Sequence, residues 1–295
     1  MNYIYICNTS SDSISKIDAK DFKLIKTIIL SKNSNQKIGP HAICRYMDKL
    51  LIANNYSEEI SILDINEDKL ITETFYVGKH CNDIKVNKNF GYILCGDENS
   101  INVLDMNEMR IIERIPTEDF PHSIDFDYKK QRILISNMRS DSILISERSK
   151  FDKLRRIKVG DYPTKAIFTE DGEEIVVCES NLGSYERGSI SIFSSESLKM
   201  INKISVGFSP VDMEYEKGIC YVSNFGEGTI SIIDIYNYNK INKINIGGMP
   251  RSIKKMGEYL YVLDNYNNKL YRIDLLTENK KAISIGKEPT GMAFV

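Results

Sequence analysis

Short apolar segments of five or six residues, separated by turn residues, recur along the whole chain. One stretch shows four of them in succession, at residues 211–215, 220–224, 229–234 and 241–246. Segments this short, rich in β-branched and aromatic residues and bounded by Gly, Asn and Asp, are typical of β-strands rather than helices. The pattern predicts four antiparallel strands in this stretch, with residues 211–215 as the inner strand.

Prolines mark a repeat of this four-strand pattern about every 40 residues. Six of the seven prolines occupy one position of the repeat, and a cysteine takes the same position once. Four short strands per unit at this period are the signature of a propeller blade. The seven marker positions are Pro40, Cys81, Pro121, Pro163, Pro210, Pro250 and Pro289. They predict an all-β fold, a seven-bladed β-propeller with four antiparallel strands per blade, as a single domain over residues 1–295.

The two ends of the chain each hold part of one blade. The chain begins in a second strand, residues 3–7, and ends in an inner strand, residues 290–295. We therefore expect the C-terminal inner strand to join the N-terminal strands in one sheet. Such a closure of the ring leaves no open sheet edge.

Two further motifs carry a resemblance to a known family. Second strands end in Asn after a small residue, and Val-Gly-x-x-Pro linkers precede inner strands, as in Val159–Pro163 and Val206–Pro210. The second-strand segments are Tyr5–Asn8, Leu51–Asn54, Leu134–Asn137 and Tyr221–Asn224. Over essentially its whole length the chain resembles the bacterial YVTN-type β-propeller repeat proteins. The resemblance implies the fold and a bacterial source, but no activity, because propellers host unrelated functions.

Charge and composition narrow the class of partner. With 39 basic and 41 acidic residues the formal net charge is −2, and no run of like charge stands out. This argues against nucleic acid or an anionic membrane surface as the partner. The first residues read as a strand and not as a signal peptide, and no C-x-x-C pair occurs among the six cysteines, so we expect a cytoplasmic protein.

The cysteines are interpreted mainly as packing residues. Cys7, Cys95 and Cys178 are aligned with the small-residue position of the second strand, where a free Cys behaves as a small buried hydrophobe. Cys81, in the proline position of a linker, is the thiol that we expect to be most reactive. No histidine is spaced for zinc, so no metal site is predicted, and the sequence leaves any cofactor open.

Polar residues follow the marker position in several units. His41 and His122 come directly after the marker proline, and Asn82 and Arg251 occupy the same position in two other units. We expect these four residues on one face of the propeller, at the mouth of its channel. One interpretation is structural: the four residues pack at the mouth of a channel whose inner strands carry charges that form compensating ion pairs. The other is that they hold a small polar ligand.

Loops between second and third strands present large side chains on a polar background. The residues are Tyr56, Met138, Arg139, Tyr185, Phe225 and Tyr266. Two insertions, at residues 31–39 and 181–188, fall on the same predicted face. Aromatic, Met and Arg side chains are enriched at interface centres, so we predict that this loop face binds a protein or peptide. The alternatives are that each side chain packs against its own blade, or that the protein is a lyase or hydrolase, possibly metal-assisted, acting on a small polar ligand with His41, His122 and Arg251. No catalytic residue is assigned.

Overall fold

The computed structural model describes residues 3–31, 37–147 and 150–295. These residues form seven four-stranded antiparallel sheets and two single-turn 3-10 helices, Thr9–Ser11 and Gly96–Glu98. The protein is therefore an all-β, seven-bladed propeller, as the marker spacing predicts. Five residues of the insertion predicted at 31–39, residues 32–36, lie outside the described part of the chain.

The chain divides into two compact units. Unit 1 comprises Met1–Pro116, Leu263–Asp274 and Asn279–Val295, and unit 2 comprises Thr117–Val262 and Leu275–Glu278. The seventh blade consists of β24 (Pro250–Met256), β25 (Tyr259–Asp264), β26 (Lys269–Asp274) and β27 (Lys280–Ser284).

Unit 1 contains the first three blades. Blade 1 is the sheet of β28 (Pro289–Phe294), β1 (Tyr3–Asn8), β2 (Ser13–Asp18) and β3 (Lys23–Ile29). Blade 2 consists of β4 (Pro40–Tyr46), β5 (Lys49–Asn54), β6 (Glu59–Asp64) and β7 (Lys69–Tyr76). Blade 3 consists of β8 (Cys81–Asn87), β9 (Phe90–Cys95), β10 (Ser100–Asp105) and β11 (Arg110–Pro116).

Unit 2 contains the next three blades. Blade 4 consists of β12 (Pro121–Asp127), β13 (Arg132–Asn137), β14 (Ser142–Glu147) and β15 (Lys150–Lys158). Blade 5 consists of β16 (Pro163–Phe168), β17 (Glu174–Glu179), β18 (Arg187–Ser194) and β19 (Met200–Phe208). Blade 6 consists of β20 (Pro210–Glu216), β21 (Ile219–Asn224), β22 (Thr229–Asp234) and β23 (Asn239–Asn245).

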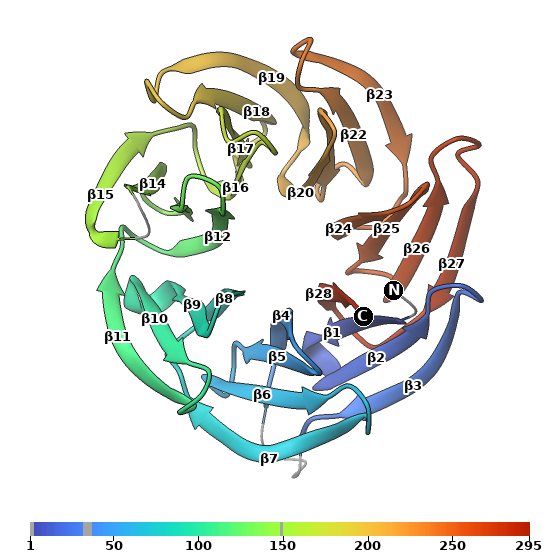
Figure 1. Cartoon of the computed structure of the whole chain (residues 1–295). Coiled ribbons are helices and arrows are strands. Elements are labelled where there is room, and N and C mark those ends of the chain that lie inside the picture. Colours follow the sequence, from blue (N-terminus) through green and yellow to red (C-terminus); the bar gives the residue numbers. More distant parts are fainter. Residues whose placement is uncertain (1–2, 32–36, 148–149) are drawn as a thin grey trace. The chain divides into compact units, whose positions relative to one another are not determined.

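The two chain ends meet in blade 1, as predicted for closure. β28 pairs antiparallel with β1, with Phe294 opposite Ile4 and Met292 opposite Ile6 (Figure 1). Backbone hydrogen bonds between Tyr3 and Val295 extend the pairing by one residue on each strand. The last strand of the chain thus covers the edge of β1 that would otherwise be open.

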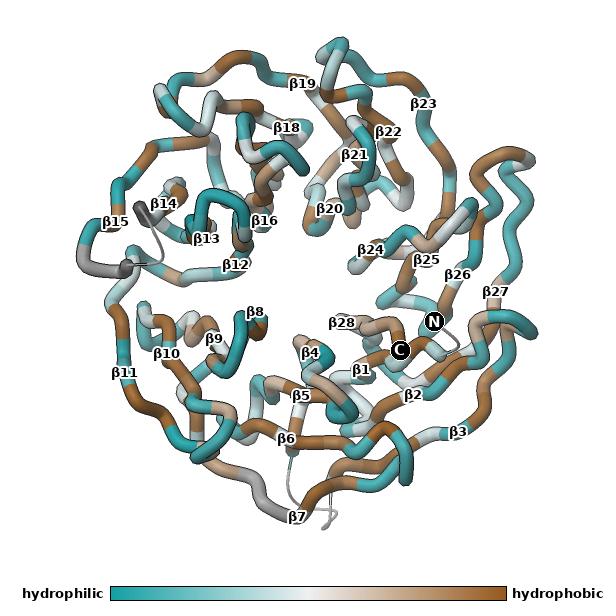
Figure 2. The backbone as a smooth tube through the Cα atoms, in the orientation of Figure 1, coloured by the Kyte–Doolittle hydropathy of each residue, from teal (hydrophilic) through white to brown (hydrophobic). Residues whose placement is uncertain are grey.

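The hydrophobic core lies between neighbouring sheets. In unit 1, one cluster joins Tyr5 and Ile14 of blade 1 to Leu50 and Ile52 of blade 2. Figure 2 shows hydrophobic positions along the strands of all seven sheets. Second strands such as β5 are buried at five consecutive positions, as expected for a sheet that packs on both faces. Five of the seven third strands end in an Asp. Asp64, for example, accepts a hydrogen bond from the Asn66 backbone amide at 2.8 Å, which forms the turn into the outer strand.

One predicted alignment is wrong. Cys7 and Cys178 occupy the small-residue position, but Cys95 is the last residue of β9 and lies opposite the first residue of β8. It therefore occupies the position that Asn54 holds in blade 2. Cys81 is the first residue of β8 rather than a loop residue, and its side chain is fully buried.

Candidate functional site

The first residues of the inner strands in unit 2 are joined by hydrogen bonds between blades. His122 Nδ1 lies 2.6 Å from the Thr164 carbonyl oxygen, and the Thr164 hydroxyl lies 3.4 Å from the Pro210 carbonyl oxygen. Because a carbonyl only accepts, Nδ1 of His122 carries a proton, and in the neutral form of the ring Nε2 is then the acceptor. The position after the marker proline thus connects one blade to the next.

In unit 1 the residue after the marker proline also connects neighbouring blades. The Thr290 hydroxyl donates to the His41 carbonyl oxygen at 3.0 Å, which joins blade 1 to blade 2. His41 is half-buried on β4, and Asn82 is buried on the neighbouring β8. Sequence reasoning did not foresee this connecting role, because each bond joins residues far apart in the chain.

The four predicted channel-mouth residues fall in two pairs. His41 and Asn82 lie on adjacent inner strands of unit 1, whereas His122 and Arg251 lie on β12 and β24 of unit 2, with β16 and β20 between those strands. Arg251 is half-buried, and its carbonyl oxygen accepts a hydrogen bond from the Ser223 hydroxyl at 3.3 Å. Its backbone therefore also connects two blades.

Charges on the inner strands of unit 2 compensate one another. Lys165 on β16 forms an ion pair with Asp212 on β20, and the other Asp212 oxygen accepts hydrogen bonds from the Ser252 hydroxyl and the Ile253 amide at 2.9 and 3.1 Å. Burial alone would raise the pKa of Asp212, but Lys165 and Lys254 outweigh it and hold that pKa below its usual range. These charges tie three inner strands together, as the ion-pair interpretation predicts.

The loop side chains differ strongly in exposure. Tyr185 is fully exposed, Tyr266 is 70% exposed and Tyr56 is 56% exposed. The Tyr56 ring covers Gly39, where a Cβ would lie 2.4 Å from the ring and where φ is +65°. Tyr56 therefore needs a glycine beneath it, whereas Tyr185 projects from its loop.

Three other predicted residues pack against the linkers beside them. The Arg139 guanidinium stacks over the Phe120 ring at 3.9 Å, and the Met138 amide donates to the Phe120 carbonyl oxygen at 2.9 Å. Phe225 is half-buried, and its amide donates to the Ser209 carbonyl oxygen at 3.0 Å. These three residues thus pack against their own blades, which was the alternative to a binding role, although the Arg139 side chain remains exposed.

The loop that carries Tyr185 is anchored at its base. The Asn181 side-chain amide donates to the Arg187 carbonyl oxygen at 2.7 Å and closes the loop. The Arg187 guanidinium lies over the Phe208 ring at 4.8 Å and pairs with Glu227 of the next blade at 3.3 Å. Burial would raise the pKa of Glu227, but Arg187 and Lys243 lower it overall, so the carboxylate stays charged. No sequence signal marked Arg187 or Glu227.

Metal ligands do not converge in the described part of the chain. Among residues 3–31, 37–147 and 150–295 no group of three or more His, Cys, Asp or Glu side chains is arranged to hold a metal ion. None of the described helices has the length and hydrophobicity needed to cross a membrane.

Comparisons with known proteins add to the fold and not to the site. No protein-family model and no curated protein matches the sequence. Similar solved structures include a functionally unknown protein from Desulfotomaculum acetoxidans, with a TM-score of 0.82 and 13% identity over 99% of this chain and 98% of that one. Hydrazine synthase of Kuenenia stuttgartiensis has a TM-score of 0.74 and 16% identity over 96% of this chain and 92% of that one.

A streptogramin B lyase structure is also similar, with a TM-score of 0.74 and 16% identity over 88% of each chain. At these identities the likeness shows a shared propeller fold. Proteins as different as a synthase and a lyase share it, so the fold itself does not specify an activity.

Proposed function

We propose that the protein is a bacterial, YVTN-type propeller without enzymatic activity, which binds a protein or peptide through its second-to-third-strand loops. The observation that carries the proposal is Tyr185, a fully exposed aromatic side chain on an anchored loop. Exposed aromatic anchors dominate the energetics of protein interfaces, and loops held by a rigid scaffold commonly carry binding residues.

The surface proposed in unit 2 is defined by its exposed side chains. The unit 2 loop surface consists of Arg139, Tyr162, Leu182 and Tyr185, with Phe225 half-buried beside them. Its residues come from the linkers and the second-to-third-strand loops of blades 4, 5 and 6, which lie at the same ends of their sheets. Arg139 and the aromatic residues suit a partner that offers apolar side chains with acidic groups at the edge.

Unit 1 offers a second, separate set of exposed aromatics in equivalent loops. Tyr56 and Tyr266 are more than half exposed, and we propose that they also contact the partner. All six cysteines are free thiols, which supports a reducing compartment such as the bacterial cytoplasm.

The proposal is tested by site-specific photo-crosslinking in the source cells. A photoreactive phenylalanine analogue is placed at position 185 or, as the matched control, at position 128. Tyr128 is 65% exposed in the same unit, but it follows the end of β12 and so lies at the opposite end of its sheet. We expect a discrete protein adduct from position 185 and none from position 128. Adducts of equal yield from both positions, or none from either, would contradict the proposal.

A second candidate function rests on His122. Its ring has the tautomer in which Nε2 accepts a proton, as required of a general base acting on a small polar ligand, with Arg251 of the same unit as an anion contact. Under this alternative the protein is a lyase or hydrolase. A thermal-shift screen of polar metabolites and divalent metals distinguishes the two: a ligand whose stabilisation disappears in both His122→Asn and Arg251→Gln favours the enzyme.

A further inference from the structure

Blade 3 departs from the other blades at two positions that face each other. In four blades the marker proline pairs with the Asn that ends the second strand, and in blade 5 Pro163 pairs with Glu179. The four Pro–Asn pairs are Pro289 with Asn8, Pro40 with Asn54, Pro121 with Asn137, and Pro210 with Asn224. In blade 3 both members are cysteine, because Cys81 lies opposite Cys95.

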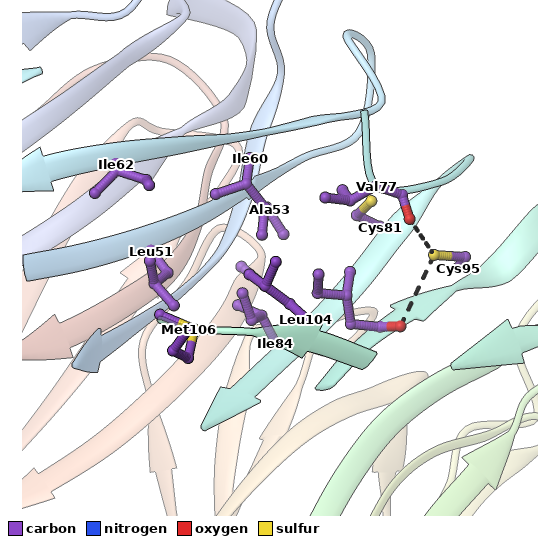
Figure 3. Close-up of a cluster of buried hydrophobic side chains, with 12 residues drawn as sticks. Leu51, Ala53, Ile60, Ile62, Val77, Cys81, Ile84, Cys95, Leu104 and Met106 are labelled. Carbon is purple, nitrogen blue, oxygen red and sulfur yellow. Dashed lines mark hydrogen bonds between the residues drawn. The ribbon is translucent and has the colours of Figure 1, made fainter. Parts of the chain in front are cut away.

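The two thiols point to the same side of the sheet. Cys81 Sγ donates to the Gly78 carbonyl oxygen at 3.2 Å, and Cys95 Sγ donates to the neighbouring Val77 carbonyl oxygen at 3.4 Å. Figure 3 shows both sulfur atoms beside Val77, within the apolar cluster that joins blades 2 and 3. The neighbouring Cys81 thiol, and then burial, raise the pKa of Cys95 above its ordinary value.

The strongest side-chain hydrogen bond to the linker comes from a residue outside the pair. In blade 6, Asn224 holds the linker by accepting a hydrogen bond from the Gly207 amide at 2.9 Å. In blade 3 the linker is held by a residue of the third strand, because the Asn102 side-chain amide donates a hydrogen bond to the Val77 carbonyl oxygen at 2.5 Å. The two thiols add only weak S–H hydrogen bonds to the Gly78 and Val77 carbonyl oxygens, so fastening of the linker alone does not explain two opposed cysteines in place of Pro and Asn.

We propose that Cys81 and Cys95 are a redox-active pair that forms a reversible disulfide across β8 and β9. Cys81 and Cys95 are opposite each other beside a β-bulge between Cys81 and Asp83. Directly opposed residues of antiparallel strands have Cβ atoms about 4.5–5.5 Å apart, somewhat more than the roughly 3.5–4.5 Å of a disulfide, so the two strands must approach each other locally when the bond forms.

The chemistry is thiol–disulfide exchange with a low-molecular-weight disulfide such as oxidised glutathione. One protein thiol, as its thiolate, attacks the disulfide and releases one glutathione thiol, which leaves a mixed disulfide on the protein. The second cysteine then attacks the protein sulfur and releases the second glutathione. Two protein thiols are oxidised and one glutathione disulfide is reduced to two thiols, so protons and electrons balance.

Oxidation also changes the linker above the pair. The disulfide has no S–H groups, so the hydrogen bonds from the two thiols to the carbonyl oxygens of Gly78 and Val77 are lost. Since both side chains are fully buried, the oxidant reaches them only when the linker at residues 77–80 opens. We therefore expect slow oxidation of the native protein and faster amide exchange in this linker once the bond has formed.

The test uses the native full-length protein incubated with oxidised glutathione. Free thiols are counted after denaturation, and tryptic peptides are mapped by mass spectrometry. We expect four free thiols instead of six, one crosslink between peptides 80–85 and 89–110, complete reversal by a dithiol reductant, and an unfolding midpoint about 5 °C higher in the oxidised form.

Two controls keep the result specific. Cys178 and Cys220 lie in the neighbouring blades 5 and 6 on strands that are not paired, and they should stay reduced. The Cys95→Ser variant should give no crosslink and instead a glutathione adduct at Cys81. Six free thiols after prolonged native incubation, a crosslink that forms only in denaturant, or crosslinks among other cysteines in equal yield would overturn the proposal.

Discussion

Lys165 and Asp212 form an ion pair that joins the inner strands of blades 5 and 6. Both side chains are largely buried, and Asp212 also accepts hydrogen bonds from blade 7 through Ser252 and Ile253. A carboxylate that satisfies partners on two neighbouring strands fixes their register as well as their charge balance. The charged residues of these inner strands therefore act first as connectors between blades.

Replacing Asp212 by Asn should destabilise the protein by about 3 kcal/mol, because it leaves the largely buried Lys165 side chain without its counter-charge. Chemical denaturation at pH 7 measures the loss. Arg156→Met is a control at an outer-strand ion pair in which both side chains, Arg156 and Glu118, are well exposed, and it should cost less than about 1 kcal/mol. A loss below 1 kcal/mol for Asp212→Asn would contradict this account.

The same pair predicts a dependence on pH. The pKa of Asp212 is lower in the folded protein than in the unfolded chain, so its contribution is complete above the ordinary value of about 4 and is lost as the pH falls through the lowered value. The gap in unfolding midpoint between the wild type and Asp212→Asn should therefore narrow from pH 6 to below pH 3. A gap that stays constant over this pH range would show that the charge of Asp212 does not cause the difference in stability.

Removal of the C-terminal strand tests the closure of blade 1. Deleting residues 290–295 exposes the edge of β1 and removes the buried Met292 and Ala293. The lost hydrogen bonds and buried surface together correspond to about 5 kcal/mol or more, so the unfolding midpoint should fall by about 10 °C. The Lys287→Ala variant, in the exposed linker before β28, is the control and should unfold like the wild type. An unchanged midpoint after the deletion would contradict the pairing.

Substitutions at His122 separate a connecting role from a chemical one. The side-chain amide of Asn can replace Nδ1 as the donor to the Thr164 carbonyl oxygen, and Asn82 already occupies the equivalent position in blade 3. We expect His122→Asn to keep the wild-type stability and His122→Ala to lose about 1 kcal/mol, measured by denaturation. Equal losses in both variants would argue against the hydrogen bond.

Most of the fold could be predicted because nearly every blade has the same marker and turn residues at the same positions. The marker prolines gave the blade boundaries, and the incomplete blades at the two ends gave the pairing of β28 with β1. Blade 3 was misaligned at Cys95 because it lacks both the proline and the Asn that fix the register elsewhere. Where the marker proline and the Asn are both replaced, the local sequence does not show which residues of the first and second strands lie opposite each other.

The candidate site could be predicted only in outline. The loop positions were found from the repeat, but their exposure depends on which linker residue lies beneath each side chain. Arg139 stacks on Phe120, whereas Tyr185 extends from a loop held by Asn181 and Arg187. The bond from His122 to Thr164 joins residues 42 positions apart, and nothing in the local sequence signals it.

The central claim is that the Tyr185 loop binds a protein partner. It is tested most directly by the affinity of the partner captured through position 185 for Tyr185→Ala and Tyr128→Ala, measured calorimetrically with purified proteins. We expect Tyr185→Ala to weaken binding at least tenfold, with an unchanged unfolding midpoint, and Tyr128→Ala to bind like the wild type. Equal affinities for the two variants would contradict the account.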